Sequence, residues 1–176
     1  MGNHRFRSGV TVWFTGLPSS GKTTLATSLE KRLLDDGHRV EHLDGDVLRT
    51  YLTNDLGFSK EDRDRNVRRV GFVADLLSRN GVTVICSLIS PYAAAREDVR
   101  RLHGDRFVEV WVSTPLEVCA ERDLKGLYAR QRAGQVRGLT GVDDPYEPPP
   151  SPEVTVPAHL QTVEESVEAI LSVLRA

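Results

Sequence analysis

The sequence has few cysteines, and it lacks the long apolar runs that cross membranes. Its 176 residues contain two cysteines, Cys86 and Cys119, whose spacing fits neither a disulfide framework nor a metal site. Each lies in an apolar segment, so we expect a reduced thiol in the core. No apolar run reaches the roughly 20 residues that a membrane-spanning helix needs, and residues 1–9 lack the apolar stretch of a signal peptide. We therefore expect a cytoplasmic protein without a membrane partner.

An excess of charge of one sign is also missing. Lys and Arg number 23 against 25 Asp and Glu, which gives a formal net charge of −2. This balance gives no reason to expect nucleic acid as a partner. Charged residues make up 27% of the chain and hydrophobic residues 39%, and the length suits one domain with a sizeable core. We expect a short flexible tail over residues 1–9 and a single domain over residues 10–176.

The motif with the clearest chemical meaning lies near the N-terminus. Residues 16–23 read Gly-Leu-Pro-Ser-Ser-Gly-Lys-Thr, which fits the phosphate-binding pattern G-x-x-x-x-G-K-[ST]. An apolar, β-branched run precedes the motif, and a segment with leucines at four-residue spacing follows it, so a strand, the loop and a helix are expected in that order. Backbone N–H groups and the helix N-terminus then face an anion. In this arrangement Lys22 reaches the β- and γ-phosphates, and the Thr23 hydroxyl holds Mg²⁺.

Predicted strands and helices alternate along the rest of the chain. This alternation favours a parallel sheet with helices on both faces, and the phosphate loop follows the first strand. The expected fold class is therefore α/β, a three-layer P-loop kinase fold. Helix starts are predicted after Ser59 and at two capping boxes, Thr114 with Glu117 and Thr162 with Glu165. Further strands are expected at residues 39–43, 82–88, 107–112 and 154–156.

Residues 123–144, called the lid below, differ in character from their surroundings. The segment is basic at first, contains Gly126, Gly134 and Gly138 as possible hinges after Lys125, and ends in acidic residues. It has little apolar periodicity to anchor it to a core. This composition is typical of a mobile lid over a site.

Two carboxylates, Asp44 and Asp46, follow the second predicted strand. Ligands bind at this edge in open parallel sheets. The strand at residues 82–88 lacks the terminal acid that normally fixes Mg²⁺ in P-loop enzymes. One of the two carboxylates is therefore a candidate for the metal, and the other for accepting a proton from an attacking hydroxyl. A capping role for Asp46 at the next helix is an alternative that is compatible with catalysis.

Arginines cluster beside these acids, and no guanine-binding N-K-x-D sequence is present. Arg63 and Asn66 are three residues apart on one helix face, and we interpret them as ligands of an anionic acceptor. Arg68 and Arg69 are interpreted as solvated or paired with Glu61, Asp62 and Asp64. Phe58, in the preceding loop, either stacks on a flat ring or fills the core, and the sequence leaves both roles open.

Six ordered motifs together resemble those of the adenylylsulfate (APS) kinase family. The resemblance implies transfer of the γ-phosphate of ATP to the 3′-hydroxyl of APS with Mg²⁺, which yields PAPS and ADP in sulfate assimilation. It also implies a homodimer. The motifs run through most of the chain and read G-L-P-S-S-G-K-T-T at 16–24, L-D-G-D at 43–46, G-F-S-x-x-D-R-x-x-N-x-R-R at 57–69, I-S-P-Y at 89–92, K-G-L-Y at 125–128 and T-G-V-D-D-P-Y-E at 140–147.

The resemblance also implies roles for individual residues. Asp46 orients or deprotonates the 3′-hydroxyl, Phe58 stacks on the APS adenine, and Leu139 stands where the family usually has a second stacking Phe. The serine at the Ser90 position is commonly described in the family as a phosphoserine intermediate. No base adjoins Ser90 in the sequence, so we interpret it as a polar pocket contact.

Carried over to this chain, the family's pattern gives four sets of expected site residues. The catalytic set is Asp46, Lys22 and Ser90. The metal set is Thr23 and Asp44. The ATP set is Gly16, Ser19, Ser20, Gly21, Lys22, Thr23 and Thr24. The APS set is Asp46, Arg49, Phe58, Arg63, Asn66, Ile89, Ser90, Lys125, Gly138 and Leu139.

Two other functions stay open on the sequence. A related P-loop small-molecule kinase with a different hydroxyl acceptor is compatible with Leu139 in place of the family's Phe. A weakly catalytic nucleotide-binding regulatory module is the other alternative. The joint presence of Lys22, Thr23, Asp44 and Asp46 argues against such a module, because a protein without catalysis need not keep them together.

Overall fold

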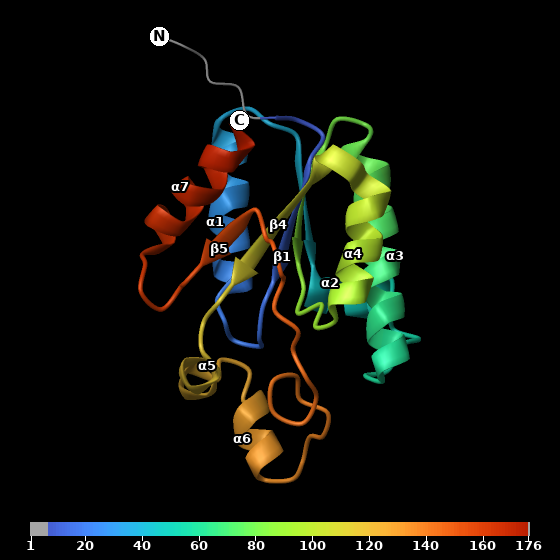
Figure 1. Ribbon diagram of the computed structural model, residues 1–176, viewed down its shortest axis with the longest axis vertical. Coiled ribbons are helices and arrows are strands. Elements are labelled where there is room, and N and C mark those ends of the chain that lie inside the picture. The colour runs from blue at the N-terminus through green and yellow to red at the C-terminus, as the bar shows by residue number, and fades with distance from the viewer. Residues whose placement is uncertain (1–6, 176) are drawn as a thin grey trace.

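The computed structural model describes residues 7–175 and has a five-stranded sheet at its centre (Figure 1). The strand order is β2-β3-β1-β4-β5, and each neighbouring pair runs parallel. This confirms the predicted α/β class with a parallel sheet. The strands are β1 (Thr11–Thr15), β2 (Val40–Asp44), β3 (Thr83–Ser87), β4 (Phe107–Val112) and β5 (Val154–Val156).

Helices cover both faces of the sheet and complete the three layers. Helices α1 (Lys22–Asp35) and α7 (Val163–Leu174) pack on one face, and α3 (Lys60–Ser78) and α4 (Ala93–His103) pack on the other (Figure 1). Every residue of β1 and β3 is buried, because both strands lie between the two helical layers. Side chains alternate along β1, so Val12 and Phe14 enter one core and Trp13 enters the other.

Short helices connect the sheet to the site. Helix α2 (Gly45–Tyr51) follows β2, a single 3₁₀ turn (Gly104–Arg106) follows α4, and α5 (Leu116–Arg122) follows β4. The expected cap at Ser59 and the capping box of Thr162 with Glu165 are both present. The capping box predicted at Thr114 was wrong. The Thr114 hydroxyl is buried and donates to the Ser20 carbonyl at 2.8 Å, so it holds the phosphate loop instead of capping α5.

The lid extends from the carboxyl end of the sheet, below it in Figure 1. It contains α6 (Leu127–Arg132) and a later coil closed by a bridge between Thr140 and Asp144. Tyr128 and Leu139 are buried against Cys119 of α5, so a small apolar cluster fixes the lid to the body of the protein. That the lid moves stays a prediction.

The expected flexible tail over residues 1–9 is shorter than predicted. The backbone N–H of Arg7 donates to the Leu174 carbonyl at 2.9 Å, so Arg7 already belongs to the fold. Residues 1–6 of the expected tail lie outside the described residues.

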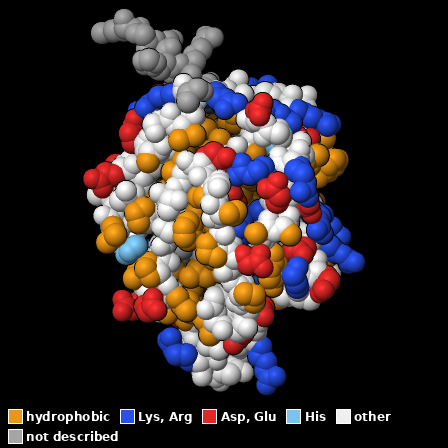
Figure 2. All heavy atoms as spheres, in the orientation of Figure 1, with side chains coloured by type: hydrophobic (Ala, Val, Ile, Leu, Met, Phe, Trp, Pro, Cys, Tyr) orange, Lys and Arg blue, Asp and Glu red, His pale blue; other side chains and the backbone are white. Residues whose placement is uncertain are grey.

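Cys86 and Cys119 are buried free thiols, as expected. Among the described helices, none has the length and apolarity needed to cross a membrane. Acidic and basic side chains are interspersed on the face shown in Figure 2.

Gly71 gives a test of how α3 packs on α4. A Cβ at Gly71 would lie 2.5 Å from Val99 Cγ2 and 2.9 Å from Cγ1, so Gly71→Ala forces the helices apart. We expect the free energy of unfolding, measured by urea denaturation, to fall by about 1–3 kcal/mol despite the better helix propensity of alanine. Adding Val99→Ala makes room for the methyl group, so the double variant should lose less than the sum of the two single losses. Additive losses would contradict this packing.

Candidate active site

A cleft of about 670 Å³ lies where the carboxyl ends of β1, β2 and β3 meet. In the register of the sheet, Ser87 of β3 pairs with Asp44 of β2 on one side and with Phe14 of β1 on the other. The carboxyl ends of these three strands therefore lie at one level. The cleft brings together most of the site residues predicted from the sequence: Ser19, Ser20, Gly21, Lys22, Thr23, Asp44, Asp46, Arg49, Phe58, Arg63, Asn66, Ile89, Ser90 and Lys125.

The phosphate loop forms one wall of the cleft. Gly21 has a φ of 111° and precedes α1, which has no side-chain cap, so the N–H groups of its first turn point toward the cleft. Gly16 has no room for a side chain, because a Cβ there would lie 2.7 Å from the Val112 carbonyl. Thr24 is exposed on α1 and, like Gly16, is not among the cleft-lining residues.

Lys22 folds back onto its own loop. Its Nζ donates to the carbonyls of Gly16 at 2.9 Å and Leu17 at 2.7 Å. The side chain is buried, and burial lowers its pKa to about 7. An ammonium in this environment gains strongly from an anion, so the lysine is placed to turn from the carbonyls to a phosphate.

Both oxygens of Asp44 accept hydrogen bonds. Oδ1 accepts from the backbone N–H groups of Asp46 and Val47, which makes Asp44 the N-cap of α2. The capping role weighed for Asp46 therefore belongs to Asp44. Oδ2 accepts from Ser87 Oγ at 3.1 Å and from Thr23 Oγ1 at 3.4 Å. Burial raises the pKa of Asp44, but these donors outweigh it and the pKa lies below its ordinary value.

Thr23 and Asp44 therefore present a hydroxyl and an ionised carboxylate beside the phosphate loop. Hard oxygen atoms of this kind suit Mg²⁺, which usually keeps several waters and binds few protein groups. No group of three or more His, Cys, Asp or Glu side chains within residues 7–175 forms a metal cage. The donor set fits an ion that is carried mainly by phosphate oxygens.

Asp46 lies at the mouth of the cleft with its side chain 73% exposed. It forms an ion pair with Lys125 of the lid, two residues before α6 begins. The pair brings the first residues of the lid to the acid that the sequence analysis placed in catalysis. Because both side chains remain largely exposed, a substrate can reach Asp46 and displace Lys125.

Phe58 is 65% exposed in the cleft, so it does not fill the core. Of the two roles left open, filling the core is excluded by this exposure, and stacking on a flat ring stays a prediction. The guanidinium of Arg49 lies 4.5 Å from the centre of the ring and donates to the carbonyls of Leu56 and Gly57. Arg49 thereby fixes the loop that presents the ring.

Arg63 and Asn66 both line the cleft, but they differ in what they offer a ligand. Arg63 donates to the carbonyls of Phe58 and Gly138 and to the Thr140 hydroxyl, so it ties the loop before α3 to the lid. Most of its donors are thus engaged within the protein, and contact of Arg63 with an anionic acceptor stays a prediction. Asn66 Oδ1 is buried and has no hydrogen-bond partner among residues 7–175. This unsatisfied oxygen keeps Asn66 a candidate ligand, and its contact with an acceptor stays a prediction.

The other two arginines are paired, as expected, but not with the predicted Glu61, Asp62 or Asp64. Arg68 binds Asp98 at 2.8 Å and Arg69 binds Asp55 at 2.6 Å, and all four side chains are at least one-third exposed. Such pairs contribute little to stability. They also keep these two guanidinium groups out of the cleft.

Ser90 lines the cleft but is held within the protein. Its hydroxyl is buried and accepts from the Trp13 indole N–H at 3.1 Å. Its φ of 41° lies in the left-handed region, where a side chain is disfavoured unless the surroundings hold it. This arrangement supports a polar contact rather than an activated nucleophile.

Gly138 and Leu139 lie outside the lining of the cleft. The Gly138 carbonyl accepts from Arg63, and Leu139 is buried beside Cys119 and Tyr128. The apolar side chain thus joins the anchor of the lid in this structure and does not face Phe58. Contact of either residue with an acceptor stays a prediction.

The residues at the site that were missed from the sequence include Ser87 and Arg122, and the cleft is also lined by the unpredicted Leu124, Leu127 and Arg130. Ser87, which donates to Asp44, lies near the end of a predicted strand at the active edge. This position was the signal that could have identified it as a site residue. Arg122, at the end of α5, donates to the carbonyls of Ser20 and Ala158 and so supports the phosphate loop. Nothing in its sequence surroundings distinguished it from a solvated arginine.

Comparison with known proteins is consistent with this site. The family described as "Adenylylsulphate kinase" matches residues 8–157. A probable adenylyl-sulfate kinase of Synechocystis sp. is 59% identical over 162 residues, which are 92% of this chain and 91% of the relative. The adenylyl-sulfate kinase of Halothermothrix orenii is 52% identical over 170 residues, 97% of this chain and 91% of the relative.

Solved structures agree with these relatives. The APS kinase CysC of Mycobacterium tuberculosis, in complex with AMPPNP and APS, superposes with a TM-score of 0.91 at 43% identity, covering 96% of this chain and 99% of that chain. A gluconokinase from Sinorhizobium meliloti shares only the fold, with a TM-score of 0.61 at 18% identity, covering 96% and 93%.

Thr114 gives a test of how the phosphate loop is held. Thr114→Val keeps the shape of the side chain but leaves the buried Ser20 carbonyl without this donor. We expect the free energy of unfolding, measured by urea denaturation, to fall by about 1–3 kcal/mol. Thr114→Ser retains the hydroxyl and serves as the control, with a smaller loss. Equal losses in the two variants would show that the hydroxyl does not support the loop.

Proposed function

The chain belongs to the adenylylsulfate kinase family, and we propose that it transfers the γ-phosphate of ATP to the 3′-hydroxyl of APS, giving PAPS and ADP for sulfate assimilation. One observation carries this proposal beyond the family name. A single cleft contains the phosphate loop at one end and Phe58 with Asn66 at the other, and Asp46 lines the same cleft. The donor and acceptor halves of a phosphoryl-transfer site thus share one space.

On the donor side, the triphosphate occupies the loop of residues 16–23. The N–H groups of the first turn of α1 bind phosphate oxygens, and Lys22 leaves the Gly16 and Leu17 carbonyls to bind the β- and γ-phosphates. Mg²⁺, held with the help of Thr23 and Asp44, neutralises phosphate charge when it is bound. Ser87 and the backbone N–H groups of α2 keep the Asp44 carboxylate oriented toward Thr23.

On the acceptor side, the adenine of APS stacks on the exposed ring of Phe58, and the Asn66 amide binds a polar group of the same nucleotide. Asp46 accepts the proton of the 3′-hydroxyl or orients that hydroxyl toward the γ-phosphate. Lys125, which is paired with Asp46 here, lies close enough to neutralise charge on the transferred group once the acceptor occupies the cleft.

Transfer is direct in this proposal. Phosphoryl transfer depends mainly on alignment and charge stabilisation, and the Ser90 hydroxyl is buried and bonded to an indole N–H that cannot take its proton. Ser90 and Ile89 therefore act as walls of the acceptor pocket.

We also propose a cytoplasmic homodimer. The buried free thiols of Cys86 and Cys119 suit a reducing compartment, and the homodimer rests on the family resemblance. A similar solved structure, the hexameric APS kinase from Thiobacillus denitrificans, is much longer, since this chain covers only 29% of it, and its assembly does not decide that of this chain. Light scattering of the purified chain at several concentrations decides the oligomeric state.

The acceptor is tested by a coupled assay of ADP release from purified protein with ATP and Mg²⁺. ADP formation should depend on APS, and PAPS should accumulate in equal amount. Turnover on another hydroxyl compound in the absence of APS-dependent turnover would overturn the proposal. ATP binding with no turnover on any acceptor would favour a regulatory module.

Asp46→Asn tests the proposed base. The amide keeps the shape but neither accepts the proton nor attracts Lys125, so kcat should fall by about 10²–10⁴-fold, while the KM for ATP changes by less than about threefold. Asp35→Asn, an exposed carboxylate on α1, is the matched control and should leave both constants unchanged. A near-normal kcat in Asp46→Asn would exclude Asp46 as the base.

Ser90→Ala separates direct transfer from a covalent intermediate. Without the hydroxyl, the buried Trp13 N–H has no acceptor, so the free energy of unfolding should fall by about 1–3 kcal/mol. Turnover should remain within about tenfold of the wild type, because no bond to Ser90 forms during the reaction. Complete loss of turnover in a folded variant, with phosphoserine detected by mass spectrometry in the wild type, would establish the covalent route.

A further inference from the structure

Two segments that are far apart in the sequence meet at the acceptor end of the cleft. One is the turn formed by Ile89 and Ser90, called the acceptor turn, which follows β3 and lines the cleft. The other is the pair Tyr146 and Glu147, called the return segment, which leads from the lid toward β5. The two segments are joined by the backbone, since Glu147 N–H donates to the Pro91 carbonyl at 2.8 Å.

Thr15, at the end of β1, bonds to both segments. Its hydroxyl donates to the Ile89 carbonyl at 2.7 Å, and the Tyr146 hydroxyl lies 2.9 Å from the same oxygen. Because a hydroxyl has one proton, Thr15 accepts from Tyr146 once it donates to Ile89. Burial raises the pKa of Tyr146 to about 12, so the phenol keeps the proton that it donates.

Arg96 makes a second bridge between the same segments. One Nη donates to the Ser90 carbonyl at 2.6 Å and the other to the Glu147 carbonyl at 2.7 Å. The guanidinium is planar and presents its donors in a fixed fork, so it sets the distance between the two carbonyls. The Ser90 carbonyl belongs to the residue with a φ of 41°, which needs such support.

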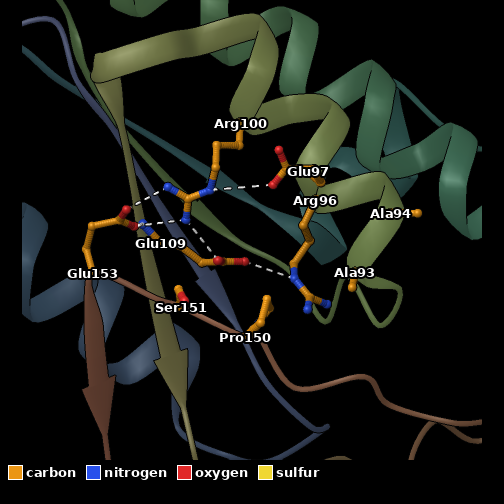
Figure 3. Close-up of a pocket in the computed structure, with 9 residues that line it drawn as sticks. All are labelled: Ala93, Ala94, Arg96, Glu97, Arg100, Glu109, Pro150, Ser151 and Glu153. Atoms are coloured by element: carbon orange, nitrogen blue, oxygen red, sulfur yellow. Dashed lines mark hydrogen bonds and ion pairs between the residues drawn. The ribbon is translucent and has the colours of Figure 1, made fainter.

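The Arg96 side chain is itself held in place by an acidic residue of the sheet. Its Nε donates to Glu109 of β4 at 2.9 Å, and both side chains are buried (Figure 3). Glu109 is bound in turn by Arg100, which pairs with Glu153 just before β5. Figure 3 shows these side chains around a pocket of about 560 Å³, with the Arg96 head group directed away from Arg100. The charges of this network are paired, so it supports Arg96 and offers no free cation to a ligand.

We propose that Arg96 and Tyr146 are positioning residues for the acceptor, because they lock the return segment of the lid to the acceptor turn. The end of the lid and one wall of the acceptor pocket then keep a fixed geometry. This inference rests on the proposed function, since it takes APS as the molecule in that pocket. The hydrogen bonds of Tyr146 and Arg96 go to Thr15, Ser90, Glu109 and Glu147 and not to the phosphate loop. Loosening this lock should therefore weaken acceptor binding and spare the donor.

A tyrosine of the lid makes the matching contact on the donor side. The Tyr128 hydroxyl donates to the Pro18 carbonyl of the phosphate loop at 3.0 Å. Tyr128→Phe and Tyr146→Phe each remove one hydroxyl and one hydrogen bond. The pair of variants thus compares the two ends of the site with the same chemical change.

The experiment measures kcat and both KM values for the two variants in the full chain. Tyr146→Phe should raise the KM for APS about three- to tenfold, in line with the loss of one net hydrogen bond, and change kcat and the KM for ATP by less than about twofold. Tyr128→Phe should show the reverse selectivity. Tyr51→Phe, with a ring that is 84% exposed, should match the wild type.

Arg96→Lys extends the test. The ammonium keeps a positive charge beside Glu109 but does not span both carbonyls, so the KM for APS should rise further than in Tyr146→Phe. If Arg96→Lys fails to fold, Tyr146→Phe alone decides. An unchanged KM for APS in Tyr146→Phe, or an equal rise in both KM values, would overturn the proposal.

Hydrogen exchange separates this inference from the proposed function. Without any ligand, the amides of Ile89, Ser90 and Tyr92 should exchange faster in Tyr146→Phe than in the wild type, and the non-proline amides of residues 16–25 should not. If the wild type shows no APS-dependent turnover, the proposed function fails. The exchange result still shows whether the lock exists: unchanged exchange at Ile89, Ser90 and Tyr92 would refute it.

Discussion

The site depends on a loop that must turn its N–H groups toward an anion. A backbone that presents its amides on one side turns carbonyls to the other, and each buried carbonyl needs a donor. In this protein Lys22 satisfies Gly16 and Leu17, Tyr128 satisfies Pro18, and Thr114 with Arg122 satisfies Ser20. Those donors come from α1, the lid, the end of β4 and α5. The requirement of one short loop thus determines where four other parts of the chain must lie.

The acceptor half is built in the same way, with side chains that bind backbone carbonyls. Arg49 and Arg63 hold the loop that carries Phe58, and Arg63 continues to the lid through Gly138 and Thr140. Arg49 uses one Nη for the Leu56 and Gly57 carbonyls, and Arg63 uses most of its donors within the protein. The exposed ring of Phe58 lies beside them, and Lys22, Lys125 and Arg130 also line the cleft. The acceptor half thus combines an aromatic face with cationic side chains.

The sequence was sufficient for the fold and for most of the residues that gather in the cleft, because both follow local patterns. Alternating apolar segments with caps at Ser59 and Thr162 predicted the layers, and the phosphate motif with Asp44 and Asp46 predicted the active edge. Long-range partners were not predictable from the sequence. Thr114 looked like a helix cap because its spacing to Glu117 allows one, but it bonds to a loop 94 residues away. Arg63 looked free for the same reason, since its partners at Gly138 and Thr140 lie on a segment with no periodic pattern.

Strand β1 connects the two halves of the site through consecutive residues. Thr15 holds the acceptor turn with its hydroxyl, and the next residue, Gly16, begins the phosphate loop. The distance between the acceptor turn and the phosphate loop is consequently set by covalent backbone in the middle of the sheet. Substitutions in the pocket walls alter which molecule fits, whereas the reach between the two binding positions stays constant. A scaffold with this property can exchange one hydroxyl acceptor for another without losing the alignment that phosphoryl transfer needs.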